Sequence, residues 1–131
     1  MARQVLLPAG VQAQASRLQV SPGILSGNHV FLTGVTGCDA DGEMPDALSD
    51  RFRRAFDKIG IVLREANLSF GAIVEMTSYH VGLPDHFELF SSVRAEYVQE
   101  PYPAWTAIEV AALRRKGAAV EIRVVATIEN D

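Results

Sequence analysis

An amphipathic helix is the clearest element of the sequence, between Asp46 and Asn67. Apolar residues recur there at spacings of three and four, and charged residues fill the opposite face. The apolar positions are Leu48, Phe52, Ala55, Phe56, Ile59, Val62, Leu63 and Ala66. This period is typical of a helix that buries one face. The pattern continues past Gly60, so we expect another residue to pack closely against this glycine, and we interpret Asn67 as the helix terminator.

A second, shorter helix is predicted after Pro84. Asp85 offers an N-cap side chain, and Pro101 and Pro103 end the helix because proline cannot continue it. The apolar stripe of this helix consists of Phe87, Phe90, Val93, Tyr97 and Val98.

Runs of β-forming residues near glycine or proline predict the strands. They cover residues 17–20, 29–36, 73–81, 105–110 and 120–128, and the first two runs are expected to pair. With the two helices they give the order ββαβαββ, which fits an α+β fold with a mixed sheet and both helices on one face. The segment 38–45 is rich in Asp, Gly and Pro and is predicted to be a surface loop.

The predicted strands carry more large apolar side chains than two helices can cover. Such residues are Phe31, Tyr79, Trp105, Ile108 and Val125. An uncovered apolar sheet face in a small domain indicates a subunit interface. We therefore expect a closed homo-oligomer.

Length and composition agree with one domain spanning residues 1–131. The chain is 48% hydrophobic and 21% charged, which is ordinary for a folded domain. Its 12 basic and 16 acidic side chains give a formal charge of −4, so no general excess of positive charge exists for a nucleic-acid backbone. We expect no nucleic-acid partner.

The single cysteine and the N-terminal segment bear on the compartment. Cys38 is the only cysteine and cannot form an internal disulfide. The apolar run before Pro8 is far shorter than a signal-peptide core or a membrane span. We expect a cytoplasmic protein with no membrane partner.

The sequence shows no strong motif for a metal or a nucleotide cofactor. His29, His80 and His86 lack a His-Glu-x-x-His spacing, and we interpret His29 and His86 as surface loop or helix-start residues. A phosphate-binding loop, a dinucleotide fingerprint and a Gly-x-Ser-x-Gly elbow are absent from the sequence. We expect no cofactor, interpret Cys38 as an inert side chain, and interpret the basic run 114–116 as a solvated turn.

The segment Glu100–Leu113 reads EPYPAWTAIEVAAL. It resembles the Pro-Ala-Arg-Ser/Thr-x-x-x-Val-x-x-Leu signature of the RidA/YjgF family, also called endoribonuclease L-PSP. Further blocks of likeness lie at 27–34, 74–79, 85–87 and 120–122. The resemblance implies a chorismate-mutase-like α+β fold and a homotrimer whose sheets pack into a central barrel, with small-molecule pockets between subunits. It also implies hydrolysis of enamines and imines to 2-oxo acids and ammonia without a cofactor.

The chain departs from the family pattern at its pocket positions. Trp105 stands where deaminating members have the arginine that holds the substrate carboxylate. Val20 stands at the family's tyrosine, beside a retained Ser21, and Ser91 stands at its asparagine. Arg123 stands at the glutamate that is thought to position water. The standard deaminase chemistry is therefore in doubt.

Two functions remain open from the sequence. In the first, Arg123 holds the carboxylate of a small anionic metabolite, Trp105 is an apolar wall, Thr106 orients water, and enamine or imine hydrolysis takes place. In the second, the trimer binds a metabolite or has a regulatory role without catalysis. An RNase function is not favoured by the net charge of −4. The candidate ligand-binding residues are Arg123, Trp105, Thr106, Ser91, Ser21, Val20 and Gly34, with no catalytic residue assigned.

Two of these candidates also have ordinary structural interpretations. Arg123 could form an interfacial ion pair with Glu121 or Glu109, and Trp105 could simply fill an interface.

Overall fold

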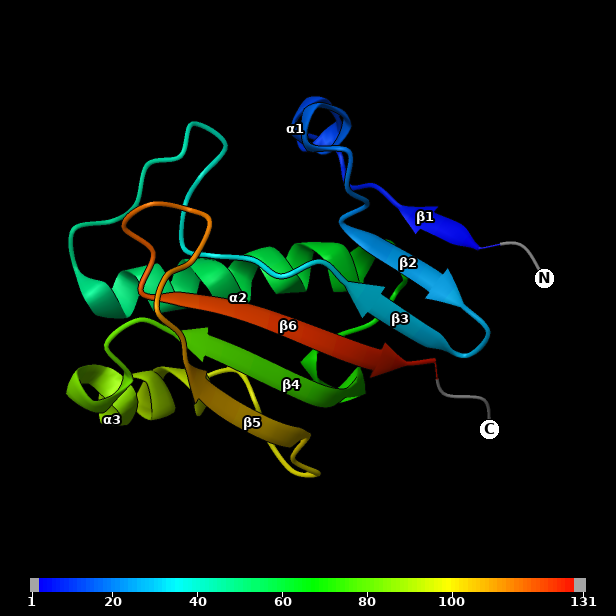
Figure 1. Cartoon of the computed structure of the whole chain (residues 1–131). Helices are drawn as coiled ribbons and strands as arrows, with labels where there is room; N and C mark the ends of the chain where they lie inside the picture. Colours follow the sequence, from blue (N-terminus) through cyan, green and yellow to red (C-terminus); the bar gives the residue numbers. More distant parts are fainter. Residues whose placement is uncertain (1–2, 129–131) are drawn as a thin grey trace.

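A mixed, six-stranded sheet organises the computed structural model, which describes residues 3–128 (Figure 1). Its strands are β1 (Gln4–Leu6), β2 (Gly23–Ser26), β3 (His29–Leu32), β4 (Ile73–His80), β5 (Ala104–Glu109) and β6 (Val120–Thr127). They lie in the order β1-β2-β3-β6-β4-β5. Only β4 and β5 pair in parallel; the other neighbours are antiparallel. The predicted domain limits, residues 1 and 131, lie outside the described residues.

Two long helices, α2 (Leu48–Glu65) and α3 (Leu83–Arg94), pack on the same face of this sheet, as predicted (Figure 1). The buried face of α2 includes Phe52, Phe56 and Ile59. An added Cβ atom at Gly60 would lie 3.2 Å from the ring of Phe70 in the 3-10 turn η1 (Phe70–Ala72), which confirms the close packing expected there. Asn67 adopts φ 59° just after α2, which confirms it as the terminator.

Alternation along the central strands decides which residues enter the core. Met76, Ser78 and His80 of β4 are each 0% exposed. They pair with Val124, Ile122 and Val120 of β6, which also face the helices. The intervening residues of both strands lie on the opposite, open face of the sheet.

The N-terminal segment differs from the prediction. A helix, α1 (Gln12–Leu18), and a left-handed Gln19 occupy most of the region where residues 17–20 were predicted to form a strand. Gln, Ala, Arg and Leu are good helix formers, and Ala15 packs inward as the buried residue of α1. The strand that pairs with β3 is instead β2, through a tight turn in which Gly27 has φ 60°. Residues 3–128 thus contain three α-helices rather than the predicted two.

Three predicted boundaries also shift. The strand expected at 29–36 ends at Leu32, although Val35 still forms an isolated bridge to Ile122. Helix α3 begins at Leu83 after a left-handed Gly82, so Asp85 lies in the first turn and does not cap the helix. It ends at Arg94, and Tyr97 and Val98 follow in a turn that still packs on the core.

The open face of the sheet carries some of the apolar residues predicted for it. Phe31 and Ile108 are 41% and 39% exposed. Trp105 was wrongly placed, because it pairs with Met76 and therefore faces the helix side. Val125 is buried at 9% exposure. Among the described residues, no helix is long and apolar enough to cross a membrane.

Candidate functional site

The candidate residues lie in three places. Val20 and Gly34 line a cavity beside α1. Arg123 and Thr106 lie on the open face of the sheet, and both flank Thr77 in register. Trp105 and Ser91 lie at the edge formed by α3 and β5. The sequence pattern therefore grouped residues that a single copy of the chain keeps apart.

The α1 cavity, as we call the hollow beside that helix, has a volume of about 200 Å³. Its walls are mainly apolar, with Val11, Leu18, Val20 and Ile61 among the lining side chains. This volume is many times the roughly 10–15 Å³ that a cavity needs in order to hold one water. The cavity therefore has room for a small organic molecule.

Lys58 of α2 lies at the inner wall of the α1 cavity. Its Nζ donates hydrogen bonds to the carbonyl oxygens of Thr36 (2.7 Å) and Cys38 (2.8 Å), and lies 3.8 Å from Cys38 Sγ. Burial lowers the pKa of Lys58 from its usual value of 10.5, and the thiol of Cys38 opposes this shift. Lys58 thus anchors the start of the 38–45 segment to α2.

Cys38 was expected in a surface loop but is buried, with 4% exposure. The hydroxyl of Thr36 donates to its Sγ at 3.3 Å. The remainder of the 38–45 segment is exposed or half-buried, as predicted. The Lys58 contacts explain this difference, because they draw the first residue of the loop toward α2.

A carboxylate reaches the α1 cavity from β6. Glu121 lines the cavity, and an added Cβ atom at Gly34 would meet its carboxylate. Glycine at position 34 therefore leaves the space that Glu121 occupies. The sequence analysis considered Glu121 only as an ion-pair partner of Arg123. Because the two residues are two positions apart in a strand, they share one face, and this spacing could have identified Glu121 as a pocket residue.

Ser21 supports the same wall through its backbone. The hydroxyl of Thr33, which lines the cavity, donates to the Ser21 carbonyl oxygen at 2.6 Å. Ser21 therefore orients a hydroxyl at the cavity, and its side chain is not among the groups that line it.

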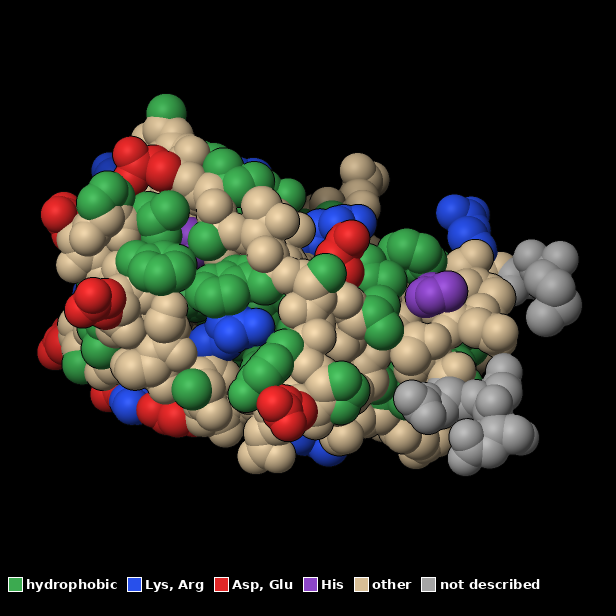
Figure 2. All heavy atoms as spheres, turned by 90° about the horizontal axis from the view of Figure 1, so that it is seen from below, with side chains coloured by type: hydrophobic (Ala, Val, Ile, Leu, Met, Phe, Trp, Pro, Cys, Tyr) green, Lys and Arg blue, Asp and Glu red, His purple; other side chains and the backbone are tan. Residues whose placement is uncertain are grey.

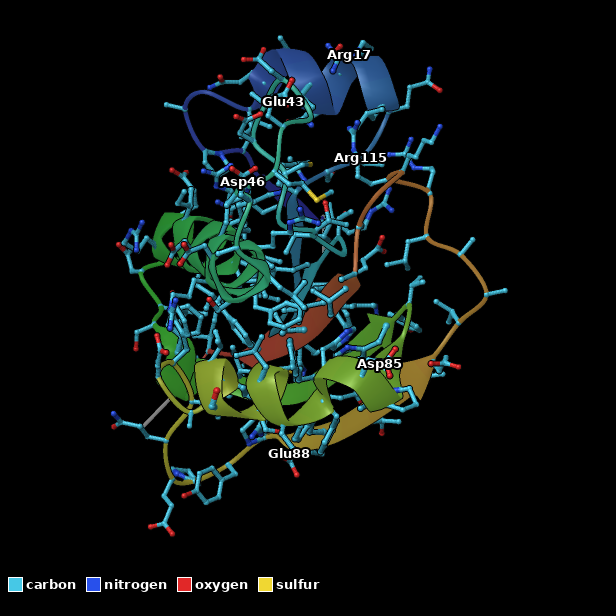
Figure 3. The ribbon with its side chains drawn as sticks, turned by 90° about the vertical axis from the view of Figure 1, so that its left-hand side faces the viewer. Arg17, Glu43, Asp46, Asp85, Glu88 and Arg115 are labelled. Atoms are coloured by element: carbon cyan, nitrogen blue, oxygen red, sulfur yellow. The ribbon has the colours of Figure 1, made fainter. Side chains whose placement is uncertain are left out.

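Arg114 and Arg115 also line the α1 cavity, which corrects their interpretation as a purely solvated turn. An added Cβ atom at Gly42 would lie 2.9 Å from Arg115 Nη1, so the β5–β6 loop touches the 38–45 segment. Figure 3 shows Arg115 and Glu43 on these loops, on the side of the molecule where α1 carries Arg17. The two loops together flank the cavity.

Arg123 lies on the open face, two residues after Glu121. Its side chain is 44% exposed, and its Nη1 is 3.8 Å from Oε1 of an exposed Glu75. The ion pair therefore involves Glu75 rather than the expected Glu121 or Glu109. Exposed pairs of this kind contribute little to stability, so the guanidinium is available for another anion.

A buried polar chain begins at Trp105. Its indole Nε1 donates to Ser78 Oγ at 2.9 Å, and Ser78 Oγ lies 2.8 Å from His80 Nε2. His80 Nδ1 in turn lies 3.0 Å from His86 Nε2. His86, expected at the surface, is only 6% exposed because its ring packs against Phe52.

Burial keeps His80 and His86 neutral near pH 7. It lowers the pKa of His80 to about 4, and a proton on the neighbouring His86 would add to the shift. Burial also lowers the pKa of His86, while Asp85 and Glu109 oppose the shift.

Arg94 was not anticipated from the sequence. Its guanidinium carbon lies 4.1 Å from the centroid of the Trp105 ring, and Phe87 stacks on the same ring at 5.7 Å. Ser91 lies between Phe87 and Arg94 at helical spacing, on the same side of α3. The structure thus places a cation against Trp105, on the side of α3 that carries Ser91. Within residues 3–128, His, Cys, Asp and Glu side chains form no group of three or more that could hold a metal ion.

Known proteins resemble this chain over almost its whole length. The family model described as Endoribonuclease L-PSP matches residues 11–128. RutC family protein YjgH of Escherichia coli K12 is 33% identical over 127 residues, which cover 96% of this chain and 95% of that protein. The bovine 2-iminobutanoate/2-iminopropanoate deaminase is 32% identical over 108 residues, which cover 81% and 77% of the two chains.

Solved structures agree with this assignment. Protein YJGH superimposes with a TM-score of 0.89 and 32% identity over 100% of both chains. RidA from the Antarctic bacterium Psychrobacter gives a TM-score of 0.79 and 28% identity, covering 98% of this chain and 99% of that one. The chain belongs to the endoribonuclease L-PSP family, which is the RidA/YjgF family that its motifs resemble.

Proposed function

We propose that this chain is a cytoplasmic homotrimer that binds a small carboxylate-bearing metabolite and hydrolyses enamines or imines to 2-oxo acids and ammonia. The observation that carries the proposal is the α1 cavity. Val20 and Gly34, two of the candidate ligand-binding residues, line it together with Glu121. The name of the bovine relative, a 2-iminobutanoate/2-iminopropanoate deaminase, supports the reaction class.

The proposed ligand lies between the α1 cavity and the open face of β6. Glu121 and Arg123 alternate onto the same side of this strand, so a molecule beside Glu121 is within reach of Arg123. The guanidinium offers paired donors to a carboxylate. Such a ligand would replace the loose contact with Glu75, whose side chain is 56% exposed.

Glu121 is the proposed residue that orients water. In the hydrolysis, the water oxygen bonds to the imine carbon while the π electrons of the carbon–nitrogen bond move to nitrogen, which takes up the proton lost by water. The resulting carbinolamine then forms the carbonyl of the 2-oxo acid as its carbon–nitrogen bond breaks and ammonia leaves. A carboxylate assists by accepting a proton from the attacking water. Thr33 and Thr106 offer hydroxyl groups near the two ends of this surface.

The proposed trimer uses the open face of the sheet. Phe31 and Ile108 are exposed there at 41% and 39%. Arg123 of β6 lies between them in the strand order, and Thr106 is on β5 with Ile108. A second copy on this face would enclose the ligand. Light scattering at micromolar concentration tests the assembly, and a stable monomer would contradict it.

The test of the reaction couples a source of 2-aminoacrylate to the measurement of ammonia. The parent protein should accelerate ammonia release. Glu121→Gln should release ammonia at least ten times more slowly than the parent while keeping the same oligomeric state. Glu65→Gln, an exposed change on α2, is the matched control. Equal rates for Glu121→Gln and the parent would exclude the assigned role.

A non-catalytic binding protein is the second candidate. It is favoured by Trp105, whose indole is committed to Ser78 and to aromatic packing and cannot hold a carboxylate as an arginine would. This alternative predicts that calorimetry detects pyruvate binding to the parent while ammonia release stays at the background rate.

A further inference from the structure

Lys58 carries a half-buried amine at the wall of the α1 cavity, and the proposed hydrolysis leaves this amine unused. Its Nζ contacts two backbone carbonyl oxygens and Cys38 Sγ. Among residues 3–128, Lys58 takes part in none of the ion pairs. The ammonium group is therefore stabilised by dipoles, without a carboxylate in direct contact.

Positive charge acts on Lys58 from two elements. Arg54 lies one helical turn before it on α2, and Arg115 lines the cavity from the β5–β6 loop, on the side that faces α1 in Figure 3. Burial lowers the pKa of Lys58, and the charges of Arg115 and Arg54 lower it further, while the thiol of Cys38 opposes the shift. Like charges and desolvation both favour the neutral amine, which is the nucleophilic form of lysine.

The excess of positive charge is local to the cavity. On the face shown in Figure 2, basic side chains are scattered, and several lie beside acidic ones. The described lining of the cavity has three cations, Lys58, Arg114 and Arg115, and a single carboxylate, that of Glu121. Arg115 also takes part in none of the ion pairs among residues 3–128. A new negative charge at Lys58 would therefore be favourable.

The cavity indicates which reagent can reach the amine. It has a volume of about 200 Å³ and mainly apolar walls, with Val11 and Ile61 among them. A small uncharged molecule enters such a space without the desolvation cost that an ion would meet. Carbon dioxide is small and uncharged, and it adds to a neutral amine to give a carbamate anion. This product replaces the repulsion between Lys58 and Arg115 by attraction.

We propose that Lys58 is a carbamate-forming residue, to which carbon dioxide adds reversibly. The ammonium group first releases a proton to solvent. The lone pair of Nζ then bonds to the carbon of carbon dioxide, one carbon–oxygen π pair moves to oxygen, and the nitrogen releases a second proton. The guanidinium of Arg115 pairs with the carbamate oxygens.

Carbamate formation changes how Lys58 holds the 38–45 segment. The carbamate nitrogen keeps one N–H, so it retains a hydrogen bond to the carbonyl of either Thr36 or Cys38 and gives up the other. The contact with Arg115 replaces the lost one and joins α2 to the β5–β6 loop. This modification site goes beyond the proposed hydrolysis and does not depend on it.

The sequence contains two lysines, Lys58 and Lys116, and the exposed Lys116 is an internal control. We would equilibrate the whole chain with isotopically labelled carbon dioxide at slightly alkaline pH, alkylate carbamates with triethyloxonium and map the modified lysines by peptide mass. Lys58 should be trapped at least tenfold more than Lys116. NMR of the labelled parent should show a carbamate resonance that disappears in Lys58→Arg, a variant that keeps a cation with N–H donors.

The role of Arg115 is tested in the same assay. Arg115→Ala should raise the carbon dioxide concentration for half-maximal trapping at Lys58 at least threefold, whereas the exposed Arg64→Ala on α2 should behave as the parent. Equal values for Arg115→Ala and the parent would overturn the pairing with Arg115.

Two results would overturn the site itself. One is equal trapping of Lys58 and Lys116 in the parent, a comparison that needs no variant to fold. The other is a set of labelled resonances that is the same in the parent and in folded Lys58→Arg. Failure of the hydrolysis proposal is recognised separately, by the absence of both ammonia release and pyruvate binding in the parent without added carbon dioxide.

Discussion

Gly34 and the carboxylate of Glu121 share one space at the wall of the α1 cavity, because a Cβ atom added to Gly34 would meet that carboxylate. The carboxylate is the far end of a flexible side chain and can move aside. The glycine therefore matters for where Glu121 points more than for whether the chain folds.

Gly34→Ala should displace Glu121 from the cavity and lower ammonia release by about tenfold, roughly 1.4 kcal/mol in the barrier. Its free energy of unfolding in urea should change by less than about 1 kcal/mol, since a surface side chain absorbs the contact. Gly71→Ala is the control, because an added Cβ there meets nothing within 4 Å. Unchanged activity in Gly34→Ala would separate Glu121 from the reaction.

Gly37→Ala should be far more damaging to stability than Gly34→Ala. The added Cβ would meet the backbone carbonyl of Arg51 in α2, and backbone of a packed helix cannot move aside cheaply. Overpacking of this kind costs about 1–3 kcal/mol. Urea unfolding of the two variants side by side measures the difference, and equal midpoints would be inconsistent with it.

Lys58→Met should destabilise the chain by about 1–3 kcal/mol, because it leaves the carbonyl oxygens of Thr36 and Cys38 without their donor. Hydrogen exchange should also speed up in the 38–45 segment. Lys116→Met, in the β5–β6 loop, is the matched control. Protection of the 38–45 segment that stays at the parent level would show that the loop is held by other contacts.

The buried side chains of His80 and His86 make the free energy of unfolding depend on pH. Burial lowers the pKa of His80 to about 4, while an unfolded histidine titrates near 6.5. Between these values the unfolded chain binds more protons, so the free energy of unfolding should fall as the pH drops from about 6.5 to 4. The full effect of His80 is at most about 3 kcal/mol.

This dependence can be measured by urea unfolding at several pH values and by the NMR titration of the histidine rings. His29→Gln, an exposed change, should keep the slope, and His80→Gln should flatten it. An NMR pKa of His80 near 6.5 would contradict the prediction even if the variant failed to fold.

Sequence periodicity located the elements that bury a wide apolar face. The helix predicted between Asp46 and Asn67 is confirmed as α2, and the predicted last strand is confirmed as β6. The strand predicted at residues 17–20 was wrong. Helix α1 has only seven residues, which are too few to show a clear helical period. In such a short segment the contacts made by Ala15 decide the conformation.

The candidate site was predicted only in part, because the register between paired strands cannot be deduced from any single segment of the sequence. Val20, matched to a pocket position of the family, and Gly34, a further candidate, both line the α1 cavity. Trp105 was assigned to the wrong face because its direction depends on the register with Met76. Arg94 and Lys58 were missed, since a charged residue on an amphipathic helix normally indicates a solvated face.

Arg123 provides the remaining test of the proposed function. Its guanidinium lies on the same side of β6 as Glu121 and makes only a loose contact with Glu75, at 3.8 Å. A charge-assisted pair with a ligand carboxylate is worth about 1.5–3 kcal/mol. Arg123→Ala should therefore weaken pyruvate binding by about one to two powers of ten, measured by calorimetry, while light scattering shows an intact oligomer.

Glu75→Gln is the control for Arg123→Ala, because it removes the ion pair and leaves the guanidinium in place. This variant should bind pyruvate at least as tightly as the parent, since the carboxylate of Glu75 no longer competes for Arg123. The two variants should thus move the affinity in different directions. If both bind pyruvate as the parent does, Arg123 is a surface residue of the sheet and the carboxylate must be held elsewhere, and Arg115 at the cavity wall is the cation to substitute next.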